Sequence, residues 1–490
     1  MRLKLIFLLA FFALSKDITS QISAEKRLFD CVNTIINDKN LKGAFFGVKL
    51  VDCGTGKIIF EHNPELKMIP ASIQKVITTG TGFSRLGDAY TFKTSVYRDG
   101  TIVADSVLNG NLYIAGGGDP SLGSENFPES ASETVFNKIT CGLKNAGIAK
   151  INGRIIVDDS YFDGNRSTSE TVHPSWEWED IGSCYGTGVH GLNFCENFFT
   201  ATISCNKPAG IAIIPEYPYS EIVMPAVEAD ITIIHRDSLP NVAPFSSPET
   251  NRYIIRGEMP SGKDVELDCA LQNPSIAFEF WLRNYLSHNG IAAIYNTVDS
   301  AFGSEKHLLM EIESPPYREL AKFTNYVSNN LFADAIFKNI SKQATGEASF
   351  SKSAKNMNDF LNKTLNLNTQ NIRIVDGSGL SRHNLTTAEF MCEYLRAIKL
   401  HVPDFHLSLP SPGSDKSTLK YFMTSYSNKN SKERIFLKSG SMTGVLNYAG
   451  YIINKKGETI CVVIMTNNFL CKTKELRPKL ERLVYLMSEL

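Results

Sequence analysis

Hydrophobic and polar residues alternate in distinct patterns at the start of the chain. Residues 24–36 place apolar side chains at helical spacing, whereas residues 45–52 alternate as a strand does. A turn is expected at 53–56, and residues 57–61 read as the returning strand of a β-hairpin. Residues 71–76 follow a proline, which disfavours a helical residue before it, so a helix is expected to begin there.

Similar patterns appear at the end of the chain. Strands are expected at 448–453 and 459–466, on either side of a turn at 455–457. Apolar residues then recur at helical spacing, and this closing helix is expected to start at Pro478. A hairpin and a helix at each end imply one sheet that is assembled from both ends of the chain.

The middle of the chain, from about residue 91 to 306, has a different pattern of apolar and polar residues. It contains short apolar runs between turn residues and little helical periodicity. The clearest predicted strands are 112–115, 154–157, 211–214, 231–234 and 253–256. We therefore expect a mainly β insertion of one or two domains, followed by helical structure at 317–340.

Length and composition narrow the class of protein. A chain of 490 residues is long for one core and indicates two or three domains. Its apolar content of 43% and charged content of 21% are ordinary for a soluble globular protein. The formal net charge of −1 gives no support for nucleic acid or an acidic membrane surface as the main partner.

The first 20 residues have the pattern of a secretory signal. Arg2 and Lys4 precede an apolar run at 5–14 that is too short to span a bilayer comfortably. With cleavage expected near Ser20, the mature protein would be exported and soluble, in the periplasm or cell envelope. An uncleaved, tethered form is the alternative, and peripheral association with a membrane or cell wall stays open.

Ten cysteines are compatible with an exported chain. Disulfides within the Cys184, Cys195 and Cys205 cluster or between Cys461 and Cys471 are one interpretation, and buried free thiols are the other. The sequence contains no Cys-x-x-Cys pair, which argues against a zinc or redox site.

Ser72 and Lys75 form the first candidate catalytic pair. Three residues apart on a helix, they share one face. A serine hydroxyl needs a base nearby, and a lysine in a dry site beside other cations can lose its proton and serve as that base. The Ser-x-x-Lys pattern alone is weak, because it also occurs at 23/26, 349/352 and 417/420.

Two later motifs make the pattern specific. Ser328-x-Asn330 and Lys438-Ser439-Gly440 follow in this order, and the lysine–hydroxyl–glycine triplet occurs once, just before the C-terminal hairpin. With Ser72-x-x-Lys75, they resemble the motif set of the penicilloyl serine transferases, the penicillin-binding proteins and serine β-lactamases.

The spacing of roughly 250 residues between the first two motifs narrows this resemblance. The chain resembles the class C low-molecular-mass penicillin-binding proteins, the D-alanyl-D-alanine carboxypeptidase/endopeptidase type, which carry extra domains there. Further matches lie at 110–113, 116–122, the 176–178 loop, 314–316 and 376–382, and the resemblance covers nearly all of the mature chain. Ser439 replaces the threonine of many relatives but keeps the hydroxyl group.

The resemblance implies an α+β, multidomain fold. A β-lactamase-like catalytic domain, with helices around an antiparallel sheet, would comprise 21–92 and 306–490. The mainly β insertion would form domain II at 93–195 and 270–305, and domain III at 196–269.

The resemblance also implies a mechanism. Ser72 would attack the carbonyl of the penultimate D-alanine of a peptidoglycan stem peptide, and Lys75 would take its proton. Ser328 would relay a proton to the leaving D-alanine, while Asn330 orients Lys75 and the substrate amide. Water would then hydrolyse the acyl-enzyme, whereas a β-lactam would stay bound to Ser72 as a covalent inhibitor. No metal or organic cofactor is required.

The substrate-binding residues follow from the third motif. Lys438 and Ser439, beside Gly440, would hold the terminal carboxylate through charge-assisted contacts. The N–H groups of Ser72 and Ser441 would form the oxyanion hole. In relatives an acidic residue of the insertion binds the free amine of the substrate side chain. Asp158 is the candidate here, although a surface acid in a turn is equally consistent.

Two loops have competing interpretations. The stretch 116–120 is a tight turn or, less simply, a phosphate loop. The stretch 174–180 is a packed loop or a site for cations or sugars.

Two rival functions also stay open: a serine β-lactamase or esterase, which would turn penicillin over rapidly, and a non-catalytic wall-binding scaffold, whose role would survive Ser72→Ala.

Overall fold

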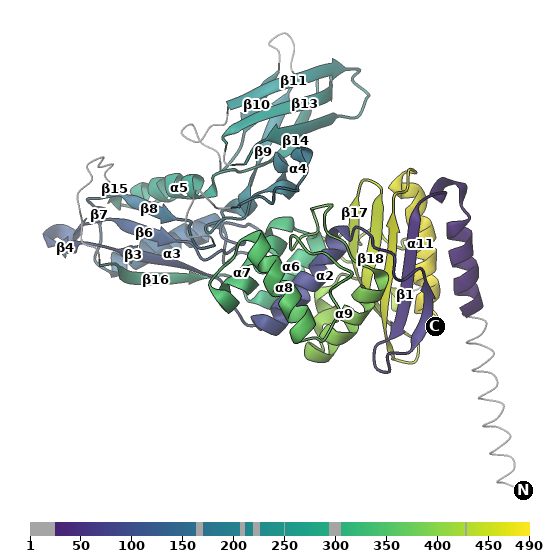
Figure 1. The fold of residues 1–490 in the computed structure, drawn as a ribbon. Coiled ribbons are helices and arrows are strands. Elements are labelled where there is room, and N and C mark those ends of the chain that lie inside the picture. The colour runs from purple at the N-terminus through teal and green to yellow at the C-terminus, as the bar shows by residue number, and fades with distance from the viewer. Residues whose placement is uncertain are drawn as a thin grey trace, which may run out of the picture. The chain divides into compact units, whose positions relative to one another are not determined.

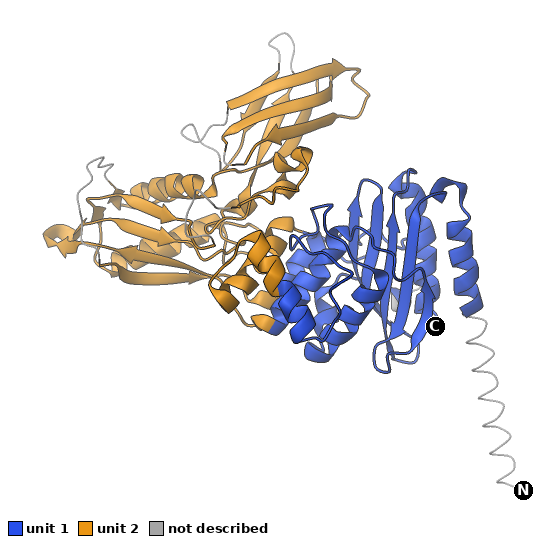
Figure 2. Cartoon of the chain, in the orientation of Figure 1, with its two compact units in different colours: residues 1–84, 321–328, 357–490 blue, residues 85–320, 329–356 orange. Residues whose placement is uncertain are grey.

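The computed structural model describes most of the chain, and its residues fall into two compact units. The described residues are 25–162, 170–205, 211–218, 226–248, 250–293, 305–426 and 429–490. The predicted signal peptide lies outside them. Unit 1 comprises 1–84, 321–328 and 357–490, and unit 2 comprises 85–320 and 329–356 (Figure 2). The domain boundaries expected from the sequence stay predictions.

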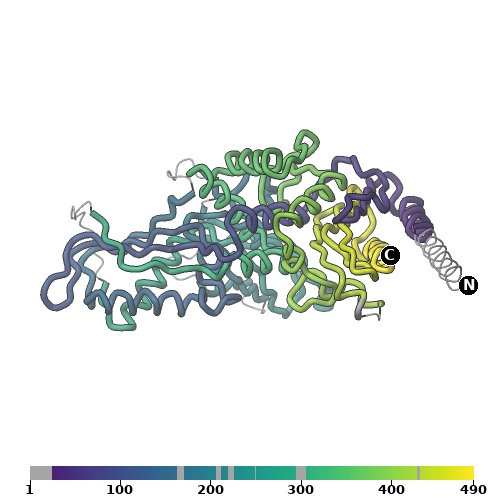
Figure 3. The backbone as a smooth tube through the Cα atoms, turned by 90° about the horizontal axis from the view of Figure 1, so that it is seen from below, coloured from purple at the N-terminus to yellow at the C-terminus, as the bar shows by residue number. Residues whose placement is uncertain are grey.

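Unit 1 is built on a five-stranded sheet of order β17-β18-β19-β1-β2, with every neighbouring pair antiparallel (Figure 1). Its strands are β1 (Phe45–Asp52), β2 (Ile58–His62), β17 (Ile435–Met442), β18 (Val445–Ile453) and β19 (Thr459–Asn467). Phe45 pairs with Asn467, so the first strand lies beside the last. In Figure 3 the purple and yellow ends of the tube run together in this way. The prediction of one sheet from both ends of the chain is confirmed.

Helices cover both faces of this sheet, so β18 and β19 are buried along almost their whole length. On one face, the helix at 25–36 and α11 (Thr473–Ser488) share an apolar core with the sheet. On the other face lies α9 (Ala388–His401), whose Leu395 carbonyl accepts a hydrogen bond from the Tyr451 hydroxyl at 2.7 Å. Two buried faces explain why these strands are continuously apolar rather than alternating.

Two helix boundaries differ from the sequence prediction. Helix α11 begins at Thr473 rather than Pro478 and contains the proline within it. The proline lacks one N–H donor, but burial of Leu476 before it and Leu480 after it keeps both turns on the core. The helical stretch 317–340 is two helices, because Ser328 has a positive φ of 64°.

Further helices are α2 (Gln74–Arg85) and the short α10 (Lys429–Lys432) in unit 1, α7 (Asn330–Thr345) in unit 2, and α6 (Tyr317–Val327) and α8 (Phe350–Lys363), which contain residues of both units. Helix α7 starts with a side-chain cap, since the Asn329 Oδ1 atom accepts from the Phe332 N–H. The second sequence motif therefore lies at a break between two helices.

In its described residues, unit 2 contains four sheets and is mainly β, as predicted. One sheet, β16-β3-β6-β8, comprises β3 (Lys93–Arg98), β6 (Leu112–Ala115), β8 (Ile155–Asp158) and β16 (His307–Glu313). A second, β15-β7-β5-β4, comprises β4 (Thr101–Val103), β5 (Val107–Asn109), β7 (Lys150–Ile151) and β15 (Ala292–Ala293). A third, β10-β9-β14, comprises β9 (Phe198–Ser204), β10 (Ala212–Pro215) and β14 (Asp264–Ala270). The last, β11-β13-β12, comprises β11 (Ala226–Ile234), β12 (Asn241–Ser246) and β13 (Arg252–Pro260).

Unit 2 also contains helices that the expectation of little helical structure missed: α3 (Ser132–Asn145), α5 (Pro274–His288) and the short α4 (Trp178–Ile181). Helix α3 is rich in β-branched residues, which favour strands locally. Its Val135, Ile139 and Leu143 nevertheless lie at helical spacing and are fully buried. Tertiary packing of this face therefore overrides local propensity.

The loops at 116–120 and 174–180, which each had two interpretations, are both packed against neighbouring residues, as expected for a tight turn and a packed loop. A Cβ atom on Gly117 would lie 1.9 Å from the Lys93 carbonyl oxygen, so this tight turn requires glycine. Asp119 is buried there, which raises the pKa of its carboxyl to about 6. Trp176 is buried against Phe350, with ring centroids 5.9 Å apart.

The ten cysteines are free thiols in this structure; six of them are buried, three are half-buried and Cys141 is exposed. Within the described ranges, no helix is both long and apolar enough to cross a membrane. The same residues contain no cluster of three His, Cys, Asp or Glu side chains that could hold a metal ion.

Candidate active site

Ser72 lies on a strained turn at the start of a helix. The 3-10 turn Ala71–Ile73 leads directly into α2, and Ala71 has a positive φ of 47°. Such a conformation is costly for a residue with a Cβ atom and persists only where its surroundings impose it. Ser72 itself is half-buried, so its hydroxyl group is accessible from one side.

Two buried asparagines on the sheet impose this turn. The Asn447 side chain donates to the carbonyl oxygens of Ile69 and Pro70, both at 2.9 Å. The Asn467 Oδ1 atom accepts from the Ile69 N–H at 2.8 Å. Because β18 and β19 are packed on both faces, these two amides fix the segment before Ser72 to a rigid support.

Lys75 lies beside Ser72 within the buried part of the site. Its side chain is fully buried, and its Nζ atom is 3.0 Å from the Ser72 Oγ atom. The same Nζ atom donates to the Ser378 carbonyl oxygen at 2.7 Å. The predicted hydroxyl–amine pair therefore has the contact that proton transfer requires.

The Ser378 carbonyl is held in place by the loop around Asp376. The Asp376 carboxylate accepts from the N–H groups of Gly379 and Ser381, both at 2.8 Å. Gly379 has a φ of +81°, and a Cβ atom there would lie 2.0 Å from the Ala71 carbonyl oxygen. The loop can therefore pack against the strained turn only with glycine at this position.

Lys438 brings a second amine into the site. Its Nζ atom donates to the Ser328 Oγ atom at 2.9 Å and to the Ser439 carbonyl oxygen at 2.8 Å. The side chain is fully buried; this burial, together with the charge of Lys75, holds the pKa of Lys438 well below its usual range. The structure thus brings the first, second and third motifs together.

The third motif lies along the edge strand β17. A Cβ atom on Gly440 would lie 2.7 Å from the Pro70 carbonyl oxygen and 3.0 Å from the Ser72 nitrogen, so glycine allows the strand to approach the turn. The Ser439 hydroxyl donates to the Thr418 hydroxyl at 2.8 Å. Ser441 is exposed on the same strand.

Asn330 and Asp158 belong to unit 2 and are described within it. The Asn330 side chain donates to the Tyr185 carbonyl oxygen at 2.9 Å, and the neighbouring Asn329 donates to the Glu196 carboxylate at 2.8 Å. Asp158 ends β8 and accepts from the N–H and hydroxyl groups of Ser160, at 3.0 and 2.6 Å. The roles predicted for both residues stay predictions.

Sequence reasoning assigned no role to Ser378, Thr418, Asn447 or Asn467. For the asparagines a signal exists, because each places an amide in an otherwise apolar strand, and a buried amide needs partners. The loop of Ser378 matched the family pattern but suggested no contact with Lys75. Thr418 lies in a loop and gave no signal.

Removing the Asn447 amide should destabilise the protein and slow acylation. The Asn447→Ala change leaves two buried carbonyl groups without this donor, and we expect the free energy of unfolding to fall by roughly 3 kcal/mol. The rate of covalent labelling by penicillin should fall at least tenfold, because the Ser72 turn loses its support. Denaturant unfolding and labelling kinetics measure the two effects, with Asn137→Ala on the exposed face of α3 as control. Unchanged labelling would contradict the positioning role.

The lowered pKa of Lys438 predicts that stability depends on pH. Where the folded protein has released this proton and the unfolded chain still holds it, the free energy of unfolding rises with pH. The rise should occur below the ordinary lysine value of 10.5, down to the lowered pKa of the folded protein. Lys438→Met should flatten it in denaturant unfolding at pH 7 to 9.5, whereas Lys474→Met, at an exposed position, should not. Equal slopes in the wild type and Lys438→Met would refute the assignment.

Known proteins are similar to this chain in sequence. A model of the D-Ala-D-Ala carboxypeptidase 3 (S13) family matches residues 28–490. The D-alanyl-D-alanine carboxypeptidase DacB of Haemophilus influenzae is 28% identical over 459 residues, 91% of this chain and 90% of that protein. A D-alanyl-D-alanine carboxypeptidase of Actinomadura sp. (strain R39) is 24% identical over 453 residues, 87% and 78% of the two chains.

Solved structures show the same fold. The crystal structure of penicillin binding protein 4 (dacB) from Haemophilus influenzae matches with a TM-score of 0.77 at 24% identity, over 94% of this chain and 99% of that one. Its complex with a β-lactam matches with a TM-score of 0.72 at 25% identity, over 94% and 98%. The predicted β-lactamase-like fold with inserted domains is confirmed.

Proposed function

Since the chain belongs to the D-Ala-D-Ala carboxypeptidase 3 (S13) family, we propose that it is an exported serine carboxypeptidase that trims peptidoglycan stem peptides. The observation that carries this proposal is the 3.0 Å contact between the Lys75 Nζ and Ser72 Oγ atoms in a site that also holds Lys438. Two named relatives are D-alanyl-D-alanine carboxypeptidases, which supports the same substrate class.

The first step is acylation. As the Ser72 Oγ atom attacks the carbonyl carbon of the penultimate D-alanine, its proton passes to the unprotonated Lys75 amine. Ser72 and Ser441 N–H groups stabilise the oxyanion, each such donor being worth about 3 kcal/mol in comparable enzymes. When the C–N bond breaks, the terminal D-alanine amine takes up a proton relayed by Ser328.

In the proposal, substrate orientation depends on the third motif and on the residues Asn330 and Asp158. In the proposal, the terminal carboxylate binds to Lys438 and Ser439 beside Gly440, through charge-assisted hydrogen bonds. A carboxylate at this position would also favour the protonated form of Lys438, whose pKa is lowered in the free protein. Asn330 would orient the substrate amide, and Asp158 would bind a free amine of the stem peptide.

Hydrolysis completes the cycle. As water attacks the ester carbonyl, it gives a proton to the Lys75 amine; this proton passes to the Ser72 oxygen as the ester bond breaks, and a stem peptide shorter by one D-alanine is released. The same chemistry can open a cross-link whose acyl donor is a D-alanine, so we include endopeptidase activity in the proposal. β-Lactams resemble the D-Ala-D-Ala end and should acylate Ser72, in the periplasm or cell envelope where the substrate lies.

Mass spectrometry after incubation with labelled penicillin tests the proposal directly. One adduct per chain is expected, on the peptide that contains Ser72, and it should persist long enough to be isolated. Release of D-alanine from a synthetic peptide ending in D-Ala-D-Ala measures the carboxypeptidase activity. Rapid turnover of penicillin without a lasting adduct would indicate a β-lactamase instead, and an adduct elsewhere would overturn the assignment.

A further inference from the structure

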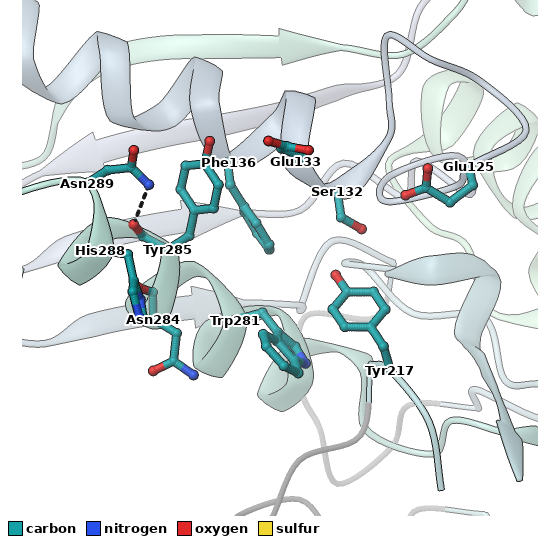
Figure 4. A pocket seen from close by; sticks show the side chains of 10 residues that line it. All are labelled: Glu125, Ser132, Glu133, Phe136, Tyr217, Trp281, Asn284, Tyr285, His288 and Asn289. Carbon is teal, nitrogen blue, oxygen red and sulfur yellow. Dashed lines mark hydrogen bonds between the residues drawn. The ribbon is translucent and has the colours of Figure 1, made fainter.

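Unit 2 contains a cavity that the proposed reaction does not use. Its volume is about 490 Å³, and it lies between the first turns of α3 and the outer face of α5 (Figure 4). Tyr217, two residues after β10, closes one side. All of the residues that line it belong to unit 2, so it can be described within that unit.

Aromatic rings form two walls of the cavity. Trp281 and Tyr285 lie one turn apart on α5, and each has a ring partner on another segment. The Tyr217 and Trp281 ring centroids are 4.9 Å apart, and the Phe136 and Tyr285 centroids are 5.7 Å apart. Such pairs bury apolar surface and present the negative faces of their rings to a ligand.

The lining carries negative charge. Glu125 and Glu133 contribute carboxylates, and the lining contains no lysine or arginine. Neither carboxylate forms an ion pair with any residue in the described part of the chain. Burial raises the pKa of Tyr285, and the Glu133 carboxylate raises it further. Burial has the largest effect on the pKa of Tyr217 and raises it; Cys195 and the Glu125 carboxylate raise it further.

The hydrogen-bond donors of the lining are largely occupied. The Trp281 indole N–H donates to the Pro218 carbonyl oxygen at 2.6 Å. The Asn289 amide donates to the Tyr285 carbonyl oxygen at 2.9 Å, and His288 Nδ1 is 2.7 Å from the Asn284 carbonyl oxygen. The cavity therefore offers two carboxylate acceptors beside ring faces, together with the Asn284 amide and the Tyr285 hydroxyl. A ligand that matches it is a hydrogen-bond donor with positive charge.

We propose that this cavity binds an alkylammonium group carried on a peptide, such as the side chain of a basic amino acid. The ammonium would contact the Glu125 and Glu133 carboxylates while its methylene chain packs on the rings of Tyr217, Trp281 and Tyr285. The identification of peptidoglycan stem peptides as the source of this amine rests on the proposed function. The recognition chemistry of the cavity is independent of that function. A neutral amino sugar fits less well, because it carries no positive charge to pair with the two carboxylates.

Three probes separate the possibilities: Nα-acetyl-L-lysine amide, its Nε-acetylated neutral analogue, and tri-N-acetylchitotriose. Calorimetric titration of the full chain should detect the lysine derivative at millimolar concentration, with weaker binding at high salt. The neutral analogue should bind at least tenfold more weakly. Equal binding of both lysine derivatives, preferential binding of the sugar, or binding of no probe would overturn the proposal.

Variants locate the binding. The double change Glu125→Gln and Glu133→Gln should weaken lysine binding at least tenfold, as should Trp281→Ala, whereas Glu129→Gln on the same loop should not. Unchanged affinity in the double variant would refute the site. Penicillin labelling of Ser72 should persist in this variant, which shows that it is folded. Conversely, lysine binding by a protein that penicillin does not label would leave this site standing while the proposed function fails.

Discussion

Replacing Ser72 by alanine is expected to abolish covalent labelling by penicillin and to lower kcat/KM for release of D-alanine by about 10⁴-fold or more. The Ser72 oxygen is the proposed acceptor of the acyl group, and the neighbouring Ser328 hydroxyl accepts a hydrogen bond from the Lys438 amine at 2.9 Å. The loss should appear in kcat, because the carboxylate contacts of Lys438 and Ser439 remain. Intact-mass measurement and a D-alanine assay provide the two readouts.

A second Ser-x-x-Lys match supplies the control for this experiment. The Ser349 hydroxyl accepts from the Lys352 N–H at 3.3 Å, and the Lys352 ammonium pairs with Glu347 at 2.9 Å. This serine thus stabilises a helix start instead of contacting an amine. Ser349→Ala should leave labelling intact and cost about 1 kcal/mol of stability at most. Labelling that survives Ser72→Ala would refute the proposed nucleophile.

Removing the base should have the second largest effect. Lys75→Met keeps the length of the side chain but removes the amine, and acylation should slow by about 10³-fold or more. Lys75→Arg restores positive charge but cannot accept a proton, because a guanidinium group stays protonated in proteins. If the lysine acts as a base, both variants should be inactive.

The comparison between the two variants separates proton transfer from simple charge. Should Lys75→Arg retain most of the acylation rate while Lys75→Met loses it, the residue would act electrostatically and not as a base. The exposed Lys67→Met, just before the Ser72 turn, is the matched control and should label normally. Circular dichroism of each variant shows whether the buried site tolerates the new side chain.

The fold was predictable where local patterns and packing agree. The strands of the hairpin at each end are apolar runs bounded by turn residues, so β1, β2, β18 and β19 could be placed to within three residues. Helix α3 could not, because its β-branched residues favour strands and only burial of Val135, Ile139 and Leu143 makes it a helix. The break at Ser328 is a backbone conformation held by tertiary contacts, which hydrophobic periodicity does not record.

For the site, the sequence predicted the groups that do chemistry better than those that position them. Ser72, Lys75 and Lys438 belong to motifs whose residue types the reaction demands, and the structure places them in one buried neighbourhood. The supporting contacts use generic groups, such as the Ser378 carbonyl and the Asn447 amide. Because every residue has a carbonyl and any asparagine can bond to one, no motif marks them.

The pairing of β1 with β19 has a consequence for biosynthesis. The N-terminal strand leaves the ribosome early but meets its partner roughly 400 residues later, so the sheet cannot close during most of translation. Until β17 to β19 emerge, the turn that bears Ser72 lacks the Asn447 side chain that holds it, and the proposed site lacks Lys438. A polypeptide released prematurely would therefore be inert toward antibiotic and substrate alike, which ties enzymatic competence to completion of the chain.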